Sequence, residues 1–108
     1  MIYIFSAFYA EAKNIIDHYG LKKEKSHEMV RFDVFANESI RLVITGVGEI
    51  NAAAAVSNIG GAYGISPDDE ILNVGCGAGF SSDICMGSIF LGNKLTEQMT
   101  GRTFYPDM

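Results

Sequence analysis

Hydrophobic and polar positions along the first twenty residues predict a strand followed by a helix. An unbroken apolar run at 2–5 is typical of a strand that is buried on both faces. Apolar residues spaced at i, i+3, i+4 and i+7 then predict a helix over 11–19 with one apolar stripe. Gly20 stands where a helix commonly ends in a left-handed residue, so we expect the helix to stop there.

The next segment alternates between apolar and polar residues. A charged stretch at 21–28 predicts a solvated connection. Strict alternation over 30–35 and again over 40–45, separated by a polar turn at 37–39, predicts two paired strands. We therefore expect an antiparallel hairpin with one face open to solvent.

Small residues dominate the middle of the chain. The alanine-rich stretch 49–59 predicts a helix that can lie close against a sheet, and the Gly60-Gly61 pair is expected to end it. The apolar run 71–74 predicts a buried strand, and 88–91 predicts a last strand. The tail from Lys94 onward is polar and is expected to be irregular.

The order strand, helix, hairpin, helix, strand predicts an α/β fold with one mixed sheet between the helices at 11–19 and 49–59. The chain has 108 residues with no repeat or clear boundary, which predicts a single domain over 1–108. Hydrophobic residues make up 48% and charged residues 19%, a composition that favours a packed core over disorder.

Charge and cysteine content narrow the classes of partner. The formal net charge of −5 and the lack of a dense basic run argue against nucleic-acid binding. No apolar run reaches the roughly 18 residues of a membrane span, and the start of the chain does not resemble a signal peptide. Two cysteines without an export signal are typical of reduced thiols, so we expect a cytoplasmic protein.

Two glycine-rich turns follow predicted strands, at 46–48 and 75–79. Glycine allows positive φ and lets backbone N–H groups approach a ligand, although such turns also serve tight packing of a helix on a strand. Neither turn completes a G-x-G-x-x-G dinucleotide fingerprint, because Asn51 and Phe80 occupy the third position. The turns predict a ligand crevice at the strand ends, without a cofactor.

Glu11 is the candidate for acid–base chemistry, because it comes just after the first predicted strand. A carboxylate there can act as a general base on water. The structural alternative is an acid in the first helical turn, where the helix dipole favours it. His18, His27, Cys76 and Cys85 lack the spacing of metal ligands, so no metal site is expected.

Three segments together resemble the nucleoside phosphorylase/nucleosidase superfamily, most closely the methylthioadenosine/S-adenosylhomocysteine nucleosidase branch. They are Ile-Tyr-Ile-Phe-Ser-Ala with Ala-Glu-Ala within 2–12, Thr-Gly-Val-Gly-Glu-Ile-Asn-Ala-Ala-Ala at 45–54, and Ile-Leu-Asn-Val-Gly-Cys-Gly-Ala-Gly at 71–79. The resemblance covers the N-terminal half of that family's fold. It implies a three-layer α/β/α fold that cleaves the N-glycosidic bond of a purine nucleoside.

The resemblance also assigns roles to single positions. Glu11 matches the acidic residue that prepares the attacking water, Val47 matches a contact to the 5′ substituent, and Cys76 matches a polar position beside the base. The other matches to substrate-binding parts of the family are Gly77, Ala78, Phe104 and Tyr105. The last two resemble a segment that caps the partner's active site in dimeric members, so we expect a homodimer. Glu11, Val47 and 76–78 should line one crevice.

Departures from the family pattern limit what this chain is expected to do. Phosphorylase members carry an arginine after the first strand and this chain does not, so water is the expected nucleophile and phosphate the alternative. The family's catalytic Asp and ribose-binding Met-Glu pair have no match here. We expect these 108 residues alone to be inactive as an enzyme. A non-catalytic module that binds a nucleoside or adenine, and a structural remnant that self-associates, are the alternatives.

Overall fold

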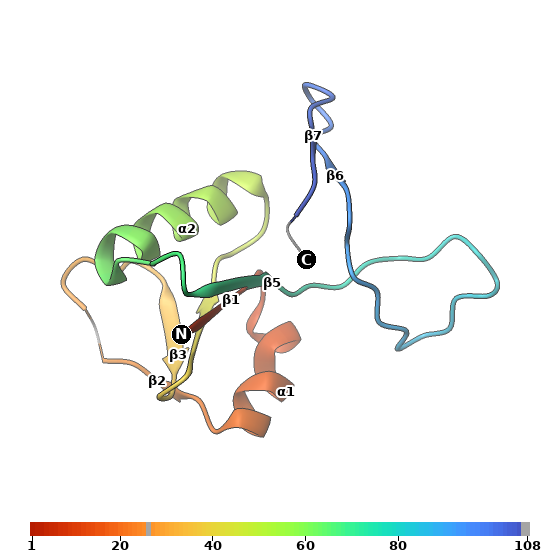
Figure 1. Ribbon diagram of the computed structural model, residues 1–108. Coiled ribbons are helices and arrows are strands. Elements are labelled where there is room, and N and C mark those ends of the chain that lie inside the picture. Colours follow the sequence, from red (N-terminus) through yellow and green to blue (C-terminus); the bar gives the residue numbers. More distant parts are fainter. Residues whose placement is uncertain (26, 107–108) are drawn as a thin grey trace. The chain divides into compact units, whose positions relative to one another are not determined.

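The structure is a computed structural model that describes residues 1–25 and 27–106 of the chain. The chain divides into two compact units, Met1–Gly77 and Ala78–Met108 (Figure 1). The first unit contains both helices and a five-stranded sheet, and the second contains a two-stranded sheet.

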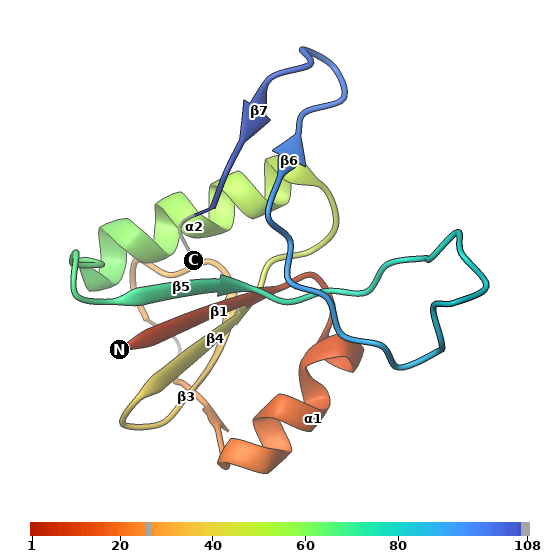
Figure 2. The same cartoon turned by 45° about the vertical axis from the view of Figure 1, so that its right-hand side comes forward.

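The sheet of the first unit has the strand order β2-β3-β4-β1-β5. Its strands are β1 (Ile2–Ser6), β2 (Lys22–Lys23), β3 (Asp33–Ala36), β4 (Ile40–Ile44) and β5 (Glu70–Asn73). The central strand β1 pairs in parallel with β4 on one side and β5 on the other (Figure 2), whereas β3 is antiparallel to both β2 and β4. The carboxyl ends of β4, β1 and β5 therefore meet at one edge of the sheet.

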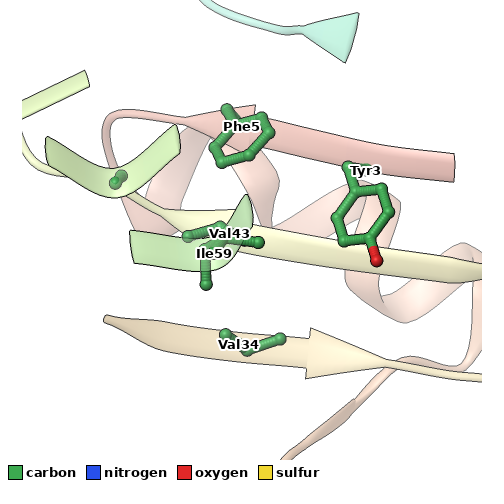
Figure 3. Close-up of a cluster of buried hydrophobic side chains, with 6 residues drawn as sticks. Tyr3, Phe5, Val34, Val43 and Ile59 are labelled. Atoms are coloured by element: carbon green, nitrogen blue, oxygen red, sulfur yellow. The ribbon is translucent and has the colours of Figure 1, made fainter. Parts of the chain in front are cut away.

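Two helices cover opposite faces of this sheet: α1 (Tyr9–Tyr19) and α2 (Glu49–Tyr63) (Figures 1 and 2). Side chains alternate between faces along a strand, so β1 contributes to both cores. Tyr3 and Phe5 pack with Val43 and Ile59 on the α2 side, as Figure 3 shows. Ile4 packs on the α1 side, in the cluster that also contains Ala12, Ile16, Leu21, Ile40 and Leu42.

The sequence prediction of a mixed sheet flanked by two helices is confirmed at this level. The strand at 2–5, the hairpin partner at 40–45 and both helices are present within a few residues of the expected ranges. Gly20 ends α1 in the left-handed conformation with φ 62°, and its N–H donates to the carbonyl of Asp17. This position favours glycine because the conformation is strained for residues with a Cβ atom.

The predicted hairpin differs from the observed one in two respects. Its first strand begins at Asp33 and not at Val30, because the Arg31 N–H donates to the Asn58 side chain of α2, 2.9 Å away. The expected solvent-exposed face was wrong as well. Val43 is fully buried toward α2 and Phe35 packs against the α1 core, so both faces of the hairpin are covered.

The end of α2 and the strand β5 also correct the sequence predictions. The helix continues through Gly60 and Gly61 to Tyr63, because packing of Tyr63 against the core offsets the cost of about 1 kcal/mol for each glycine. The strand predicted to be buried at 71–74 is observed at Glu70–Asn73, and its residues are exposed because it is an edge strand of the described sheet that pairs with β1. Val74, which follows β5, is partly buried against the α1 core. The stretch 21–28, expected to be a solvated connection, contributes the strand β2 at Lys22–Lys23.

The second unit contains one hairpin, β6 (Leu95–Thr96) with β7 (Thr103–Phe104). The tail from Lys94 is thus not irregular throughout, because Leu95 pairs with Phe104 and Gly101 closes the turn with φ 73°. The strand predicted at 88–91 is absent from this described part of the chain, and no neighbouring strand pairs with it. Ile89, Phe90 and Leu91 are exposed.

Candidate functional site

A cleft of about 480 Å³ opens where the three parallel strands end. Its walls come from the residues that follow β1, β4 and β5, together with the first turns of α1 and α2. The lining residues are Ala7, Phe8, Glu11, Thr45, Gly46, Gly48, Glu49, Ala52, Asn73, Val74, Gly75 and Cys76. Ligands of open α/β sheets bind outside the carboxyl ends of the strands, at the place this cleft occupies.

Backbone hydrogen bonds extend the sheet a short way into the cleft and hold its loops together. The Thr45 N–H donates to Ser6 O at 2.8 Å, and the Gly46 N–H donates to Ala7 O at 3.2 Å. On the other side of β1, the Val74 N–H donates to Phe5 O at 3.0 Å. The three loops are therefore fixed to one another before any ligand is present.

The Gly46-Val47-Gly48 turn needs both of its glycines. Gly46 has φ 85° and Gly48 has φ 94°, values that side chains with a Cβ atom rarely adopt. A Cβ atom at Gly46 would also lie 3.2 Å from the Asn51 side-chain nitrogen, which donates to Val47 O at 2.7 Å. Asn51, which breaks the dinucleotide fingerprint, thus closes this turn instead.

Glu11 and Cys76 meet in the cleft from different elements. Glu11 lies in the first turn of α1 and is half-buried, and Cys76 follows β5. A Cβ atom built on Gly75 would stand 3.5 Å from Glu11 Oε2, so this backbone runs directly beside the carboxylate. The Glu11 carboxylate, through a hydrogen bond and its charge, raises the pKa of the exposed Cys76 thiol.

The electrostatic character of the cleft is acidic. Glu11 and Glu49 both line it, and among the described lining residues there is no lysine or arginine. Neither Phe8 before α1 nor Gly48 before α2 caps its helix with a side-chain hydrogen bond. Free backbone N–H groups and two carboxylates therefore border the same space, which suits a neutral, hydrogen-bonding ligand better than an anion.

The structure brings together only part of the residue set predicted from the sequence. Glu11 and Cys76 line the cleft, whereas Val47 stands between two lining glycines and is itself 61% exposed outside the lining. Gly77 ends the first unit and does not line the cleft. The remaining three belong to the second unit, where Ala78, Phe104 and Tyr105 are exposed.

Sequence reasoning missed several residues that line the cleft. Thr45 and Asn73 are polar residues at the ends of β4 and β5, and Glu49 starts α2. The sequence did contain a signal for these residues. Asn73 ends β5, Thr45 directly follows β4, and Glu49 begins the helix that comes after β4. The family resemblance instead assigned Val47 and Gly77, which do not line the cleft.

Two further kinds of feature, a metal site and a membrane-spanning helix, are absent from the described residues. These residues hold no group of three or more His, Cys, Asp or Glu side chains that could bind a metal ion. Neither helix in this part of the chain has the length and apolar character needed to cross a membrane. Comparisons with family models, with curated proteins and with solved structures give no match for this chain.

Proposed function

We propose that the Met1–Gly77 unit carries the water-activating part of a purine nucleosidase site, of the methylthioadenosine/S-adenosylhomocysteine nucleosidase type. The observation that supports this most is the position of Glu11. Its carboxylate is half-buried in a cleft at the ends of three parallel strands, beside the Gly75 backbone and Cys76. In this proposal Glu11 accepts a proton from water while the water oxygen attacks the anomeric carbon, and the C–N bond to the purine breaks with its electron pair passing to the purine nitrogen, which must then gain a proton.

The acidic lining favours water over phosphate as the nucleophile. Phosphate requires cationic or densely arranged N–H donors, and the described lining residues offer two carboxylates and no lysine or arginine. The phosphorylase alternative is therefore the weaker one. The residues that would anchor ribose and protonate the leaving purine have no counterpart in the first unit, so binding without turnover is expected of this chain.

The proposal also covers the oligomeric state of the chain and its cellular location. The β5 edge of the sheet is unpaired in the described chain, and Ile71 and Leu72 are exposed on it. Unpaired edges recruit other strands, so we expect a homodimer. Cys76 and Cys85 are both free thiols, which is consistent with a reducing, cytoplasmic setting.

The direct test is an NMR titration of the 108-residue chain with 5′-methylthioadenosine. We expect amide shifts at Gly46, Glu49 and Cys76, and smaller shifts with adenine alone. Glu11→Gln should alter the binding, while Glu38→Gln, the same charge change in an exposed turn, should not. Shifts confined to residues outside the cleft, or none at all, would leave a structural role and contradict the proposal.

Turnover is measured separately, by chromatography of released adenine. We expect no appreciable hydrolysis of methylthioadenosine or S-adenosylhomocysteine by this chain alone. Adenine release at rates typical of enzymes, abolished in Glu11→Gln, would show that the first unit contains more of the catalytic apparatus than we propose.

A further inference from the structure

A second cleft, of about 530 Å³, lies in the first unit and shares no lining residue with the first cleft. Its described lining consists of residues 23–25, 27 and 30–34, together with Tyr63 at the end of α2. Its floor is apolar, since Val34 is buried and Val30 and Phe32 pack against the α2 core. An apolar floor with a few polar groups around it is the usual make-up of a small-molecule site, and the volume lies in the usual range.

The wall of this cleft is held in place by α2. The Asn58 side chain accepts a hydrogen bond from the Arg31 N–H at 2.9 Å and donates to Met29 O at 2.8 Å. The backbone of this segment is thus clamped on both sides of Val30. Further along the wall, the ring centroids of His27 and Tyr63 lie 5.6 Å apart. The two rings therefore form one aromatic pair at the cleft, and Arg41 Cζ lies 4.0 Å from the Tyr63 ring centroid.

The charges that line the cleft do not cancel. Lys23 forms an ion pair with Asp33 at 3.4 Å, and Glu24 forms one with Arg41 at 3.7 Å. The Glu24 carboxylate also accepts a hydrogen bond from the Tyr63 hydroxyl. Among the described residues, no carboxylate forms an ion pair with Lys25 or with Arg31.

Arg31 Nη1 donates to Glu28 O at 2.7 Å and to Val30 O at 3.4 Å, so the guanidinium is held by neutral carbonyls. His27 Nδ1 accepts from the Met29 N–H at 3.0 Å, which places the proton of the neutral ring on Nε2 as a further donor. The cleft therefore presents two unneutralised cations and one ring donor, in a chain whose net charge is −5.

We propose that this second cleft binds a small organic anion that carries a planar ring. The ring lies against the His27 and Tyr63 side chains, and the anionic group meets the Lys25 and Arg31 side chains. A phosphate monoester and a carboxylate share this chemistry, and Arg recognises either one in a bidentate manner. The proposal is independent of a nucleosidase role for the first cleft.

The test is an NMR titration of the 108-residue chain with phenyl phosphate, benzoate, benzyl alcohol and inorganic phosphate. We expect phenyl phosphate and benzoate to shift the His27 and Tyr63 ring signals, and tighter binding by one of them identifies the anionic group. Benzyl alcohol, which lacks the charge, and inorganic phosphate, which lacks the ring, should bind more weakly. Equal binding by either of these two would overturn the proposal.

Variants locate the site. Lys25→Gln and Arg31→Gln should each weaken the preferred anion about fivefold, the effect of one exposed charge contact worth about 1 kcal/mol. Lys22→Gln makes the same charge change on an exposed neighbour that does not line the cleft, and should leave the affinity unchanged. An equal loss in Lys22→Gln, or no loss in the other two, would refute the site.

A third variant tests the clamp without altering charge. Asn58→Ala removes both hydrogen bonds to the Arg31 segment, so we expect weaker anion binding with the far-ultraviolet circular dichroism spectrum retained. Unchanged affinity in that variant would contradict a pre-formed wall, whatever the charge variants show.

Discussion

The two units of this chain differ in whether they bury large apolar side chains. All twelve buried hydrophobic residues of the described chain, from Tyr3 to Ile59, belong to Met1–Gly77. In the second unit the large apolar side chains are exposed, for example Phe80, Ile89 and Met99. The difference shows that apolar content alone does not make a core, because burial also needs a second layer to cover it.

The reason is visible in the elements each unit contains. The first unit has a sheet with a helix on each face, so apolar residues on both sides of β1 and β4 are covered. The second unit has a hairpin whose two strands are two residues long. A single two-stranded hairpin is at best marginally stable in water. Global stability should therefore reside in the first unit.

The sharpest test of this comparison uses the same substitution in both units. Leu42→Ala removes a fully buried side chain of the α1 core and should lower the free energy of unfolding by about 2–5 kcal/mol. Leu91→Ala removes a side chain that is 77% exposed and should change it by about 0.5 kcal/mol or less. Urea unfolding followed by circular dichroism measures both. Comparable losses would mean that the second unit contributes to the cooperative core.

A second prediction concerns the polar contacts on the α2 side of the first unit. Burial, and then the hydrogen bond to Glu24, raise the pKa of Tyr63 to about 12 from an ordinary value of 10.0. The folded state then holds its proton more tightly than the unfolded state. The associated stability is complete below pH 10 and is lost as the pH rises through about 12.

Tyr63→Phe should remove this alkaline loss and also the late-titrating tyrosine in an ultraviolet titration. The variant keeps the ring that packs over Arg41 Cζ, 4.0 Å from its centroid. An unchanged profile above pH 10 would show that another group is responsible.

The β5 edge of the first unit exposes large apolar side chains, as the second unit does: Ile71 and Leu72 are both exposed. The opposite edge is the short strand β2, which carries two exposed lysines. Lysines and short strands discourage pairing with other chains, so we expect association through β5. Light scattering should give a dimer for the native chain and a monomer for Leu72→Lys. A native monomer would contradict this expectation.

The smallest expected effect is a difference in the alkylation rates of the two cysteines, one of which lies in each unit. Since Glu11 raises the pKa of the Cys76 thiol, Glu11→Gln should lower it and increase the thiolate fraction at a given pH. Alkylation of Cys76 by iodoacetamide should then be faster, while the rate at Cys85 should not change. Mass spectrometry of the modified peptides separates the two. Equal acceleration at both sites would mean that the substitution alters the whole chain and not the cleft.

Local patterns were enough to predict much of the first unit. The apolar run at 2–5, the spacing over 11–19 and Gly20 all correspond to β1, α1 and its end. The presence of a crevice between two glycine turns was also predictable, because β1, β4 and β5 lie within a few residues of their predicted ranges. Glu11 and Cys76 could be assigned to it on that basis.

The errors at 71–74 and 88–91 share one physical cause, which is that a short apolar segment does not specify its neighbours. The pattern at 88–91 is as apolar as that of β1, yet it forms no strand in the described chain because no partner strand is hydrogen-bonded to it. The pattern at 71–74 does form a strand, but its place at the sheet edge leaves it exposed. Pairing and burial are properties of the assembled sheet.

The sequence by itself determined the order and type of the first unit's main elements, because periodicity and glycine conformation act over a few residues. Only the tertiary structure decided that α2 continues past Gly60 and Gly61, that Asn58 clamps the Arg31 segment, and that Thr45 and Asn73 border the same cleft. Those outcomes depend on contacts between residues far apart in the chain, whose energies exceed local preferences only once the sheet and its two helices are packed together.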